Sequence, residues 1–261
     1  MRRVTESELE TEFEKQFCWG DDLRYFYNPN RKKASVFGHF LRIDEVLRLV
    51  KQYSSGRRLA DFACAQGNFG LLLAEQGYDV TAVDINQEFL RYAKKKYTTG
   101  NFKTVQANLI EFRDSEGFDC ILVGEVIEHV AFPNALLKSV YENLRPGGIC
   151  ILTTPNGADY SSNLPTYRSV KNIEELIPRQ FHWGDHLFLY TDDELRELFT
   201  QAGLTTLYLE KYHSAYVSQI KAVRYLLPHS ALRWLEQKTR HWQKQGKDSA
   251  NLLIAVVKKP H

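Results

Sequence analysis

The sequence predicts an α/β fold in which a mostly parallel sheet carries helices on both faces. From residue 57 onward, short apolar runs alternate with helical patterns, which is the rhythm of a parallel sheet with crossover helices. The hydrophobic share of 43 % and the charged share of 25 % are ordinary for a globular protein. A chain of 261 residues is long enough for one α/β domain with an added lobe.

The expected strands and helices follow one another in regular order. Strands are expected at 57–63, 78–84, 101–107, 118–124 and 147–154, with helices at 68–77, 86–97 and 133–144. Asn86 is placed to cap its helix, and Pro133 suits a first helical turn. Thr191 and Glu194 form a capping-box pattern for a further helix that Gly203 ends.

Several parts of the chain lie outside this alternation of strands and helices, and they divide the chain into four expected parts. We expect an N-terminal helical preface or lid over 1–56, a core over 57–212, a helical insertion over 213–248 and a final core strand within 249–261. Within the core, residues 155–190 form a long connection rich in Pro, Asn, Tyr and Trp. Long loops of this kind are typical of lids and substrate walls.

Composition excludes several classes of protein. The formal net charge of +2 gives the whole molecule no nucleic-acid footprint. None of the four cysteines forms a C-x-x-C pair, which argues against a zinc knuckle or a redox pair. The N-terminal segment is too polar for a signal peptide, and no apolar run approaches the roughly 18 residues that span a bilayer. We therefore expect a cytoplasmic protein with reduced, buried thiols.

The most informative segment is LADFACAQGNFG, residues 59–70, in which a strand ends at Asp61 and a tight turn leads into a helix. Small residues in such a turn allow a ligand to approach the backbone closely. Asp84 ends the next strand, at about the distance along the chain expected for a carboxylate that binds ribose hydroxyls. The pattern predicts a nucleotide-type cofactor site.

Here the sequence resembles the class I methyltransferases that use S-adenosylmethionine (SAM). The first motif of that family runs Asp-x-Gly-x-Gly-x-Gly, and this chain has Asp61-x-Ala63-x-Ala65-x-Gly67. Two of the three glycines are alanine, a residue that disfavours positive φ. If either family glycine needs a positive φ, we expect the loop to differ here.

Further motifs of the family follow in order. VDIN carries Asp84 and Ile85, and QANL carries Asn108 and Leu109, with Asn108 expected to face the adenine amino group. The segments FDCILVGEVIEHV, which contains Glu125, and LRPGGICILTTPN match the fourth and fifth strands. The resemblance covers about 57–211 and a strand near 250–257. It implies SAM as cofactor, bound on a seven-stranded Rossmann-like sheet with an antiparallel last strand.

Two other classes of function remain open. Ala65-x-Gly67-x-x-Gly70 imitates the fingerprint of nicotinamide-binding oxidoreductases, although such an enzyme would not require the EVIEHV and LRPGG segments. A non-catalytic nucleotide-binding module could also keep this fold, because a fold does not fix a function.

The candidate catalytic residues gather just beyond the fourth expected strand. His129 is the candidate base, with Glu128 beside it and His186 arriving from the long loop. Open parallel sheets bind ligands at such carboxyl ends. Structural roles are the alternative: Glu125 would touch only SAM, Glu128 would cap a helix and His129 would pack against the core.

The order Glu125-x-x-Glu128-His129 followed by Asp185-His186 is also similar to small-RNA 2′-O-methyltransferases of the Hen1 type. That resemblance implies a divalent metal held by two glutamates and two histidines. The same glutamate–histidine motif occurs in small-molecule methyltransferases of the ubiquinone-pathway type. We therefore expect no metal, and we expect the four side chains not to converge.

Arginines before the core are candidates for the SAM carboxylate. The ubiquinone-pathway methyltransferases have a similar Asn-Pro…Arg preface, in which an arginine meets that carboxylate. Residues 20–45 are therefore expected to help close the cofactor pocket, with Arg42 as first candidate and Arg31 as second. A solvated helix charge is the alternative.

The segment HWGDHLFLY offers a candidate wall for the acceptor pocket. Its candidate residues for this wall are His182, Trp183, Asp185, His186 and Tyr190. The alternative is a loop whose aromatic side chains only cover the edge of the sheet.

The insertion at 213–248 combines positive charge with apolar residues. The insertion contains seven cationic residues and only two acidic ones, Glu236 and Asp248, and leucines and tryptophans are interleaved among them. Such a helix could lie on an anionic membrane surface, clamp a phosphorylated or nucleic-acid acceptor, or simply pack on the core. We expect methyl transfer to oxygen of a small or lipid-linked metabolite, and we do not expect a nucleic-acid acceptor.

Overall fold

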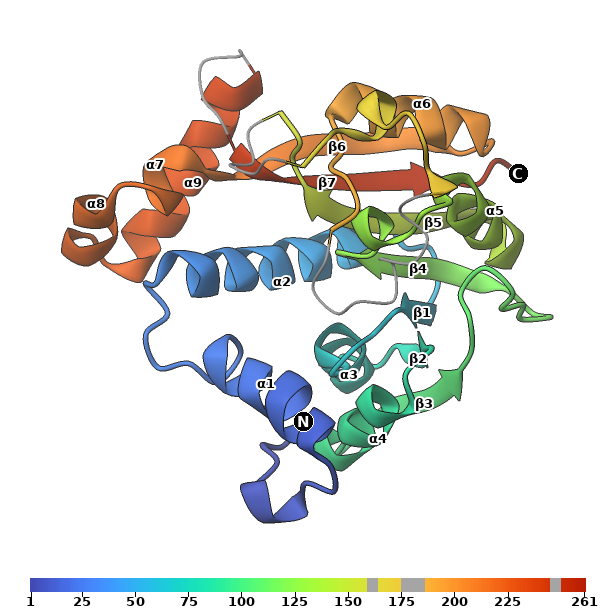
Figure 1. The fold of residues 1–261 in the computed structure, drawn as a ribbon, viewed down its shortest axis with the longest axis horizontal. Coiled ribbons are helices and arrows are strands. Elements are labelled where there is room, and N and C mark those ends of the chain that lie inside the picture. Colours follow the sequence, from blue (N-terminus) through green and yellow to red (C-terminus); the bar gives the residue numbers. More distant parts are fainter. Residues whose placement is uncertain (159–163, 175–185, 245–249) are drawn as a thin grey trace.

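A computed structural model describes residues 1–158, 164–174, 186–244 and 250–261 (Figure 1). Its centre is a seven-stranded sheet in the order β3-β2-β1-β4-β5-β7-β6, which confirms the predicted fold class. The strands are β1 Arg58–Phe62, β2 Asp79–Asp84, β3 Asn101–Gln106, β4 Phe118–Gly124, β5 Leu144–Pro155, β6 Thr205–Ser214 and β7 Ala250–Lys258. The main helices are α2 Ala34–Tyr53, α3 Asn68–Glu75, α4 Gln87–Lys96, α5 Pro133–Asn143 and α6 Asp192–Gln201.

The order and directions of the strands predict where a ligand crevice lies at the edge of the sheet. β1 to β5 pair in parallel, and β7 is antiparallel to both β5 and β6. From β1 the chain first builds outward through β2 and β3, and then returns to the other side of β1 with β4. A ligand crevice is expected at the carboxyl ends of the strands on either side of such a reversal.

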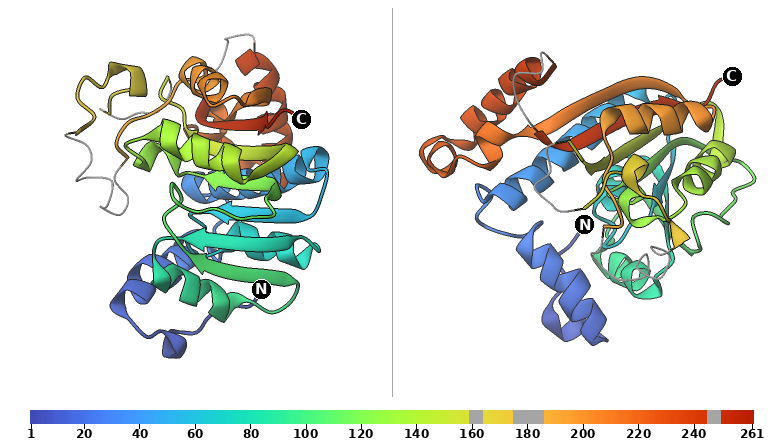
Figure 2. Two further views of the ribbon diagram at one scale, coloured as in Figure 1. Left: turned by 90° about the vertical axis from the view of Figure 1, so that its right-hand side faces the viewer. Right: turned by 45° about the horizontal axis from the view of Figure 1, so that its top comes forward.

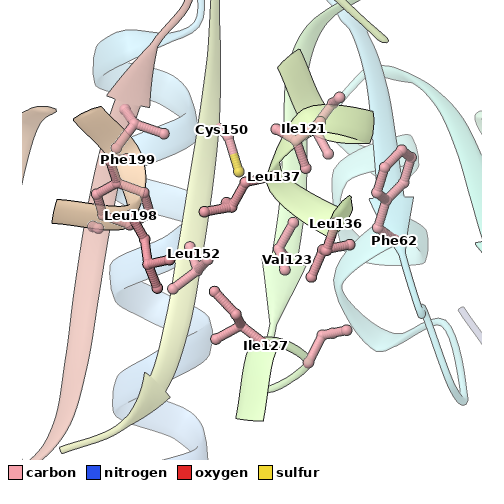
Figure 3. Packing of buried hydrophobic residues seen from close by; sticks show 14 of the residues in the cluster. Phe62, Ile121, Val123, Ile127, Leu136, Leu137, Cys150, Leu152, Leu198 and Phe199 are labelled. Atoms are coloured by element: carbon pink, nitrogen blue, oxygen red, sulfur yellow. The ribbon is translucent and has the colours of Figure 1, made fainter. Parts of the chain in front are cut away.

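Two apolar layers cover the sheet, because the central strands are apolar on both faces. On one face α2 and α3 pack against Leu59, Cys120 and Leu122. On the other face α5 and α6 pack against Ile121 and Val123. Figure 3 shows this second layer, with Leu136 and Leu137 of α5 lying over β4 and β5.

The predicted helix signals are confirmed. Asn86 Oδ1 accepts a hydrogen bond of 2.8 Å from the backbone N–H of Glu88. Pro133 opens α5, and Thr191 and Glu194 form the capping box of α6. The largest error in an expected boundary is three residues: β5 begins at Leu144 and not at residue 147.

The N-terminal segment lies across the ends of α3 and α4. It holds the 3₁₀ turn η1 (Glu6–Glu8), the π-helix η2 (Glu14–Trp19) and α1 (Gly20–Arg24). Lys96 of α4 is fully buried and donates a hydrogen bond of 2.7 Å to Asp22 of α1. Asn68 donates to the other oxygen of Asp22 at 3.0 Å. A buried ion pair therefore fastens the N-terminal segment to the core.

The insertion forms a helical lobe at one end of the molecule, beside the start of α2 (Figures 1 and 2). It comprises α7 Ala215–Ser218, α8 Lys221–Leu226 and α9 His229–Lys244. Val217 and Leu232 are buried against Phe37 and Leu41 of α2. No helix within the described residues is long and apolar enough to cross a membrane. All four cysteines are buried, and none is bonded to another.

Candidate active site

A cavity of about 490 Å³ opens at the carboxyl edge of the sheet. Its wall is assembled from segments far apart in the sequence, namely the N-terminal segment, α2, the turn after β1 and the ends of β4, β5, β6 and β7. The wall residues used below are Asp21, Asp22, Tyr25, Gly38, His39, Arg42, Gln66, Asn68, Glu125, His186, His213 and Asn251. The cavity therefore lies where the strand reversal predicts a ligand crevice.

The turn between β1 and α3 keeps a glycine-type backbone although it contains alanines. Ala63 has φ 51° and Ala65 has φ 45°, and Gly67 follows at φ 71°. The expectation that the two alanines would change the loop is wrong, because both adopt the left-handed conformation that glycine favours. Residues forced into this region cost on the order of 1 kcal/mol each, so the loop holds strain beside the cavity.

Asp61 and Asp84 are both buried at the ends of neighbouring strands and hold this turn. Asp84 accepts backbone hydrogen bonds from Ala65 at 3.0 Å and from Asn86 at 2.9 Å. Each carboxylate oxygen can accept a second hydrogen bond, so capacity for a ligand remains. Asp61 accepts from Gly70 N–H at 2.9 Å, which ties β1 to the first turn of α3.

Burial dominates the protonation of both carboxyls. Desolvation raises the pKa of Asp61 to about 7, against the usual 3.8, and the nearby charge of Asp84 adds to the rise. The pKa of Asp84 is also raised by burial, while hydrogen bonds from Asn86 and Ala65 act in the opposite direction. Asp84 is therefore the better carboxylate of the two for binding hydroxyl groups.

The predicted adenine residues lie at the neighbouring strand ends. Ile85 directly follows β2 and is 56 % exposed, which leaves a bare apolar side chain beside Asp84. Leu109 is partly buried against the core. Asn108 Oδ1 accepts a hydrogen bond of 3.1 Å from Ile110 N–H, so this oxygen already caps a turn. None of these three residues lines the cavity itself.

Arg42 and Glu125 form an ion pair on the cavity wall. Arg42 Nη1 lies 3.4 Å from Glu125 Oε1, and both side chains are about one-fifth exposed. Glu125 has φ 57°, so the turn after β4 is also in the left-handed region. Arg31, the second candidate, lies over the ring of Phe40 at 4.0 Å and does not line the cavity.

The four residues do not all converge, as expected, but three of them do. One ligand-type atom each from Glu128, His129 and His186 lies within 4.8 Å of the others. The reason is a backbone hydrogen bond of 2.8 Å from Leu187 N–H to Glu128 O, which fastens the long loop to the turn η3 (Ile127–His129). Glu125, the fourth residue, is not part of the group.

The group has a layered arrangement. His186 lines the cavity, and the ring of His129 meets it edge-on with centroids 4.9 Å apart. Glu128 is fully buried behind them and accepts a hydrogen bond of 3.0 Å from Thr154. Burial, with the charge of Glu125 adding to it, raises the pKa of Glu128 well above its usual value. A carboxyl with a raised pKa is a stronger base than an exposed one.

Of the remaining residues of the predicted acceptor wall, only Tyr190 lies in the part of the chain that the structure describes. His182, Trp183 and Asp185 lie outside the described residues. Tyr190 is buried in the core, and its hydroxyl donates to Ile127 O at 3.3 Å. Tyr190 therefore supports η3 from behind.

Buried polar atoms without a hydrogen-bond partner gather at the cavity. Among the described residues these include His39 Nε2, Arg42 Nε, Glu125 Oε1 and His213 Nε2, all on wall residues. Buried polar groups in folded proteins are nearly always paired, so such a cluster indicates a polar ligand. These atoms make the cavity a candidate binding site.

Sequence reasoning missed His39 and His213. His213 is the penultimate residue of β6 and has φ 64°, and its ring packs on the backbone of Gly38, where an added Cβ would lie 2.6 Å from it. Burial lowers the pKa of His213 to about 4 and that of His39 to about 3, so both are neutral at pH 7. Neither residue belongs to a motif, and only the meeting of α2 with β6 brings them together.

Comparison with known proteins identifies the class. A family model described as a methyltransferase domain matches residues 35–209, two-thirds of the chain. The chain belongs to this family of SAM-dependent class I methyltransferases, as the fold, the turn after β1 and Asp84 indicate.

Particular relatives carry a narrower description. The chain is 27 % identical over 157 residues to a ubiquinone biosynthesis O-methyltransferase of Psychrobacter arcticus, a match that covers 58 % of this chain and only 60 % of that protein. A protein of the same description from Coxiella burnetii is 23 % identical, with 80 % and 89 % covered. A SAM-dependent methyltransferase of Mesorhizobium loti shares the fold, with TM-score 0.57, 16 % identity, and 82 % and 96 % of the chains covered.

Proposed function

We propose that this protein transfers a methyl group from SAM to an oxygen of a small or lipid-linked acceptor. The observation that carries the proposal is the cluster of buried polar atoms without a hydrogen bond, on His39, Arg42, Glu125 and His213, in a cavity at the carboxyl edge of the sheet. Most residues of the cavity wall carry polar side chains, which suits a small molecule with several polar groups.

The residues at the strand ends fit the cofactor. Asp84 has hydrogen-bonding capacity left for ribose hydroxyls, and the turn from Ala63 to Gly67 lets a ligand approach the backbone. The exposed Ile85 offers an apolar surface to the adenine. Arg42 can take the carboxylate, exchanging its 3.4 Å contact with Glu125 for a bidentate pair. Bound SAM supplies a methyl group already activated by the sulfonium charge.

The protein's own task is to position an acceptor and remove its proton. His186 lies on the cavity wall and is our candidate for the base that touches the acceptor hydroxyl. His129 and Glu128 lie behind it and act as positioning residues that orient the imidazole. The N-terminal preface, which contributes Asp21, Asp22 and Tyr25 to the wall, acts as the lid that excludes water.

The acceptor class follows from the relatives and from the insertion. Ubiquinone biosynthesis O-methyltransferases, by their description, act on oxygen in the synthesis of a lipid. In this chain the 213–248 insertion exposes apolar and basic side chains beside the cavity-bearing helix α2. We therefore place the acceptor among small phenolic or lipid-linked molecules, with contact between the insertion and an anionic membrane surface.

Transfer of label from methyl-tritiated SAM tests this function. The acceptors are a panel of phenolic compounds and a total lipid extract, and the label is counted in the organic phase. His186→Ala is expected to lower the rate by about 10²–10⁴ while SAM affinity, measured by calorimetry, stays unchanged. His261→Ala, at the exposed C-terminus, is the matched control. Equal rates for His186→Ala and the wild type would contradict the assignment of the base.

A metal-dependent reaction is the second candidate, because the three-residue group favours it. Glu128, His129 and His186 could together hold a divalent cation that polarises the acceptor hydroxyl. We prefer the metal-independent reaction because Glu125, the fourth ligand in the Hen1-type enzymes, pairs with Arg42 instead.

Chelation separates the two candidates. Methyl transfer is expected to continue at its full rate after treatment with EDTA and desalting. Loss of activity that manganese or magnesium restores would favour the metal-dependent candidate. Methylation of the 3′-terminal ribose of a small RNA would then assign the substrate class as well.

A further inference from the structure

A second cavity, of about 270 Å³, lies between the segment before α2 and the helix α8. Its wall consists of Asn30, Lys32, Lys33, Lys221, Arg224 and Tyr225. Four of the six wall residues are cationic and none is acidic. A concave surface of this composition concentrates positive potential and selects anions.

The cations of this second cavity are not neutralised by the protein. No carboxylate of the described residues forms an ion pair with Lys32, Lys33, Lys221 or Arg224, and Arg224 Nε is buried without an acceptor. Two other cations of the insertion are paired: Arg233 reaches Asp44 at 2.5 Å and Arg240 reaches Glu45 at 2.9 Å, and both pairs dock α9 on α2. Lys221 and Arg224, by contrast, bring charge without a described carboxylate partner to the cavity wall.

Exposed apolar side chains are concentrated in the insertion, which forms one wall of this cavity. Of the ten large hydrophobic side chains that are exposed among the described residues, six belong to the insertion: Tyr216, Ile220, Tyr225, Leu226, Trp234 and Trp242. Tyr225 is 74 % exposed and Leu226 is 80 % exposed, directly beside the cations. Apolar and aromatic side chains next to lysine and arginine are typical of surfaces that enter the interface of an anionic membrane.

We propose that this second cavity binds the phosphate of an anionic phospholipid headgroup, while Tyr225 and Leu226 enter the acyl region. The inference rests on the proposed membrane contact of the insertion and names its site. The helix α2 joins the two cavities, since Lys33 precedes its first residue and Arg42 lies on the active-site wall. Nine residues of helix span roughly 13 Å, so a headgroup bound here would hold the active site close to the membrane.

Vesicle sedimentation tests the proposal with the full-length protein. The wild type is expected to bind vesicles containing phosphatidylglycerol at least tenfold better than vesicles of phosphatidylcholine alone, and to be released by 0.5 M NaCl. A cation at such a surface contributes about fivefold to binding. The double variant Lys221→Glu, Arg224→Glu should therefore lose tenfold or more, and Leu226→Ser should weaken binding to both kinds of vesicle.

Two control variants and one independent measurement accompany the test. Lys138→Glu on α5 and Leu207→Ser on β6 change an exposed cation and an exposed leucine elsewhere, and should leave vesicle binding unchanged. All variants should keep the wild-type melting temperature and SAM affinity. SAM affinity tests the methyltransferase assignment separately, so its failure is not confused with failure of the lipid site.

Three results would overturn the proposal. If the charge-reversed double variant binds anionic vesicles like the wild type, the second cavity is not the headgroup site. If the wild type binds neither kind of vesicle, the membrane contact itself is wrong. If the wild type binds pyrophosphate or single-stranded RNA but no vesicle, the cavity serves a soluble ligand.

Discussion

At the scale of single residues, the turn after β1 is defined by backbone conformation more than by residue type. Ala63 and Ala65 replace the glycines of the family motif and still adopt positive φ. The motif could be found in the sequence, but the positive φ of its alanines could not be predicted from it. Hydrogen bonds from other parts of the fold decide whether an alanine is held in that strained conformation. Here the Asp84 carboxylate accepts a hydrogen bond from Ala65 N–H and holds the turn in its strained conformation.

Restoring one glycine should relieve this strain. Ala65→Gly removes a Cβ from a residue at φ 45°, and we expect it to raise the free energy of unfolding by up to about 1 kcal/mol. Ala135→Gly, in the helix α5, should lower it by a similar amount because glycine disfavours helix. Urea denaturation of both variants measures the difference. Equal destabilisation by the two substitutions would show that Ala65 is not strained.

The raised pKa of Asp61 predicts how the free energy of unfolding changes with pH. Its pKa in the folded protein is raised to about 7, above the usual 3.8, so the folded state keeps a proton that the unfolded state loses. The free energy of unfolding therefore falls as pH rises from about 4 to about 7, by at most about 1.4 kcal/mol per pH unit. Asp61→Asn cannot ionise and still accepts from Gly70.

The comparison of Asp61→Asn with the wild type isolates the contribution of Asp61 ionisation to the free energy of unfolding. We expect the stability of the variant relative to the wild type to increase from pH 4 to pH 7 and to level off above that. Denaturation midpoints at a series of pH values provide the measurement. A difference between the two proteins that does not change with pH would exclude a raised pKa at Asp61.

At the scale of elements, the N-terminal segment is held by one buried ion pair. Lys96 and Asp22 are both buried and lie 2.7 Å apart, and Tyr92 also donates to Asp22 at 3.1 Å. Asp22 lines the active-site cavity, so the ion pair also positions a piece of its wall. The sequence indicated that residues 20–45 would help close the pocket, but no pattern marks a lysine within a helix as buried.

Breaking the pair should loosen the lid. Lys96→Met leaves the Asp22 carboxylate buried without its cation, which typically costs about 3–5 kcal/mol. Lys94→Met, two residues earlier on the exposed side of α4, is the matched control and should cost little. Limited proteolysis should cut the first 30 residues of Lys96→Met faster than those of Lys94→Met. Equal cleavage and equal melting temperatures would contradict the structural role of the pair.

At the scale of the whole molecule, the alternation of strands and helices was enough to predict the sheet, and family resemblance supplied its last antiparallel strand. The cofactor residues at the ends of β1 and β2 follow from the same alternation, because parallel strands bring their carboxyl ends to one edge. What could not be predicted depends on contacts between distant segments. His213 meets Gly38, and His186 joins Glu128 and His129, through packing that no local pattern records.

The central claim is that Asp84 holds SAM at this edge, and calorimetric titration of SAM tests it most directly. Asp84→Ala removes charge-assisted hydrogen bonds worth about 1.5–3 kcal/mol each, so SAM should bind at least tenfold more weakly. Asp79→Ala, at the opposite end of β2, is the matched control and should bind SAM like the wild type. Unchanged affinity in a folded Asp84→Ala variant, or tight binding of NADH without binding of SAM by the wild type, would contradict the account.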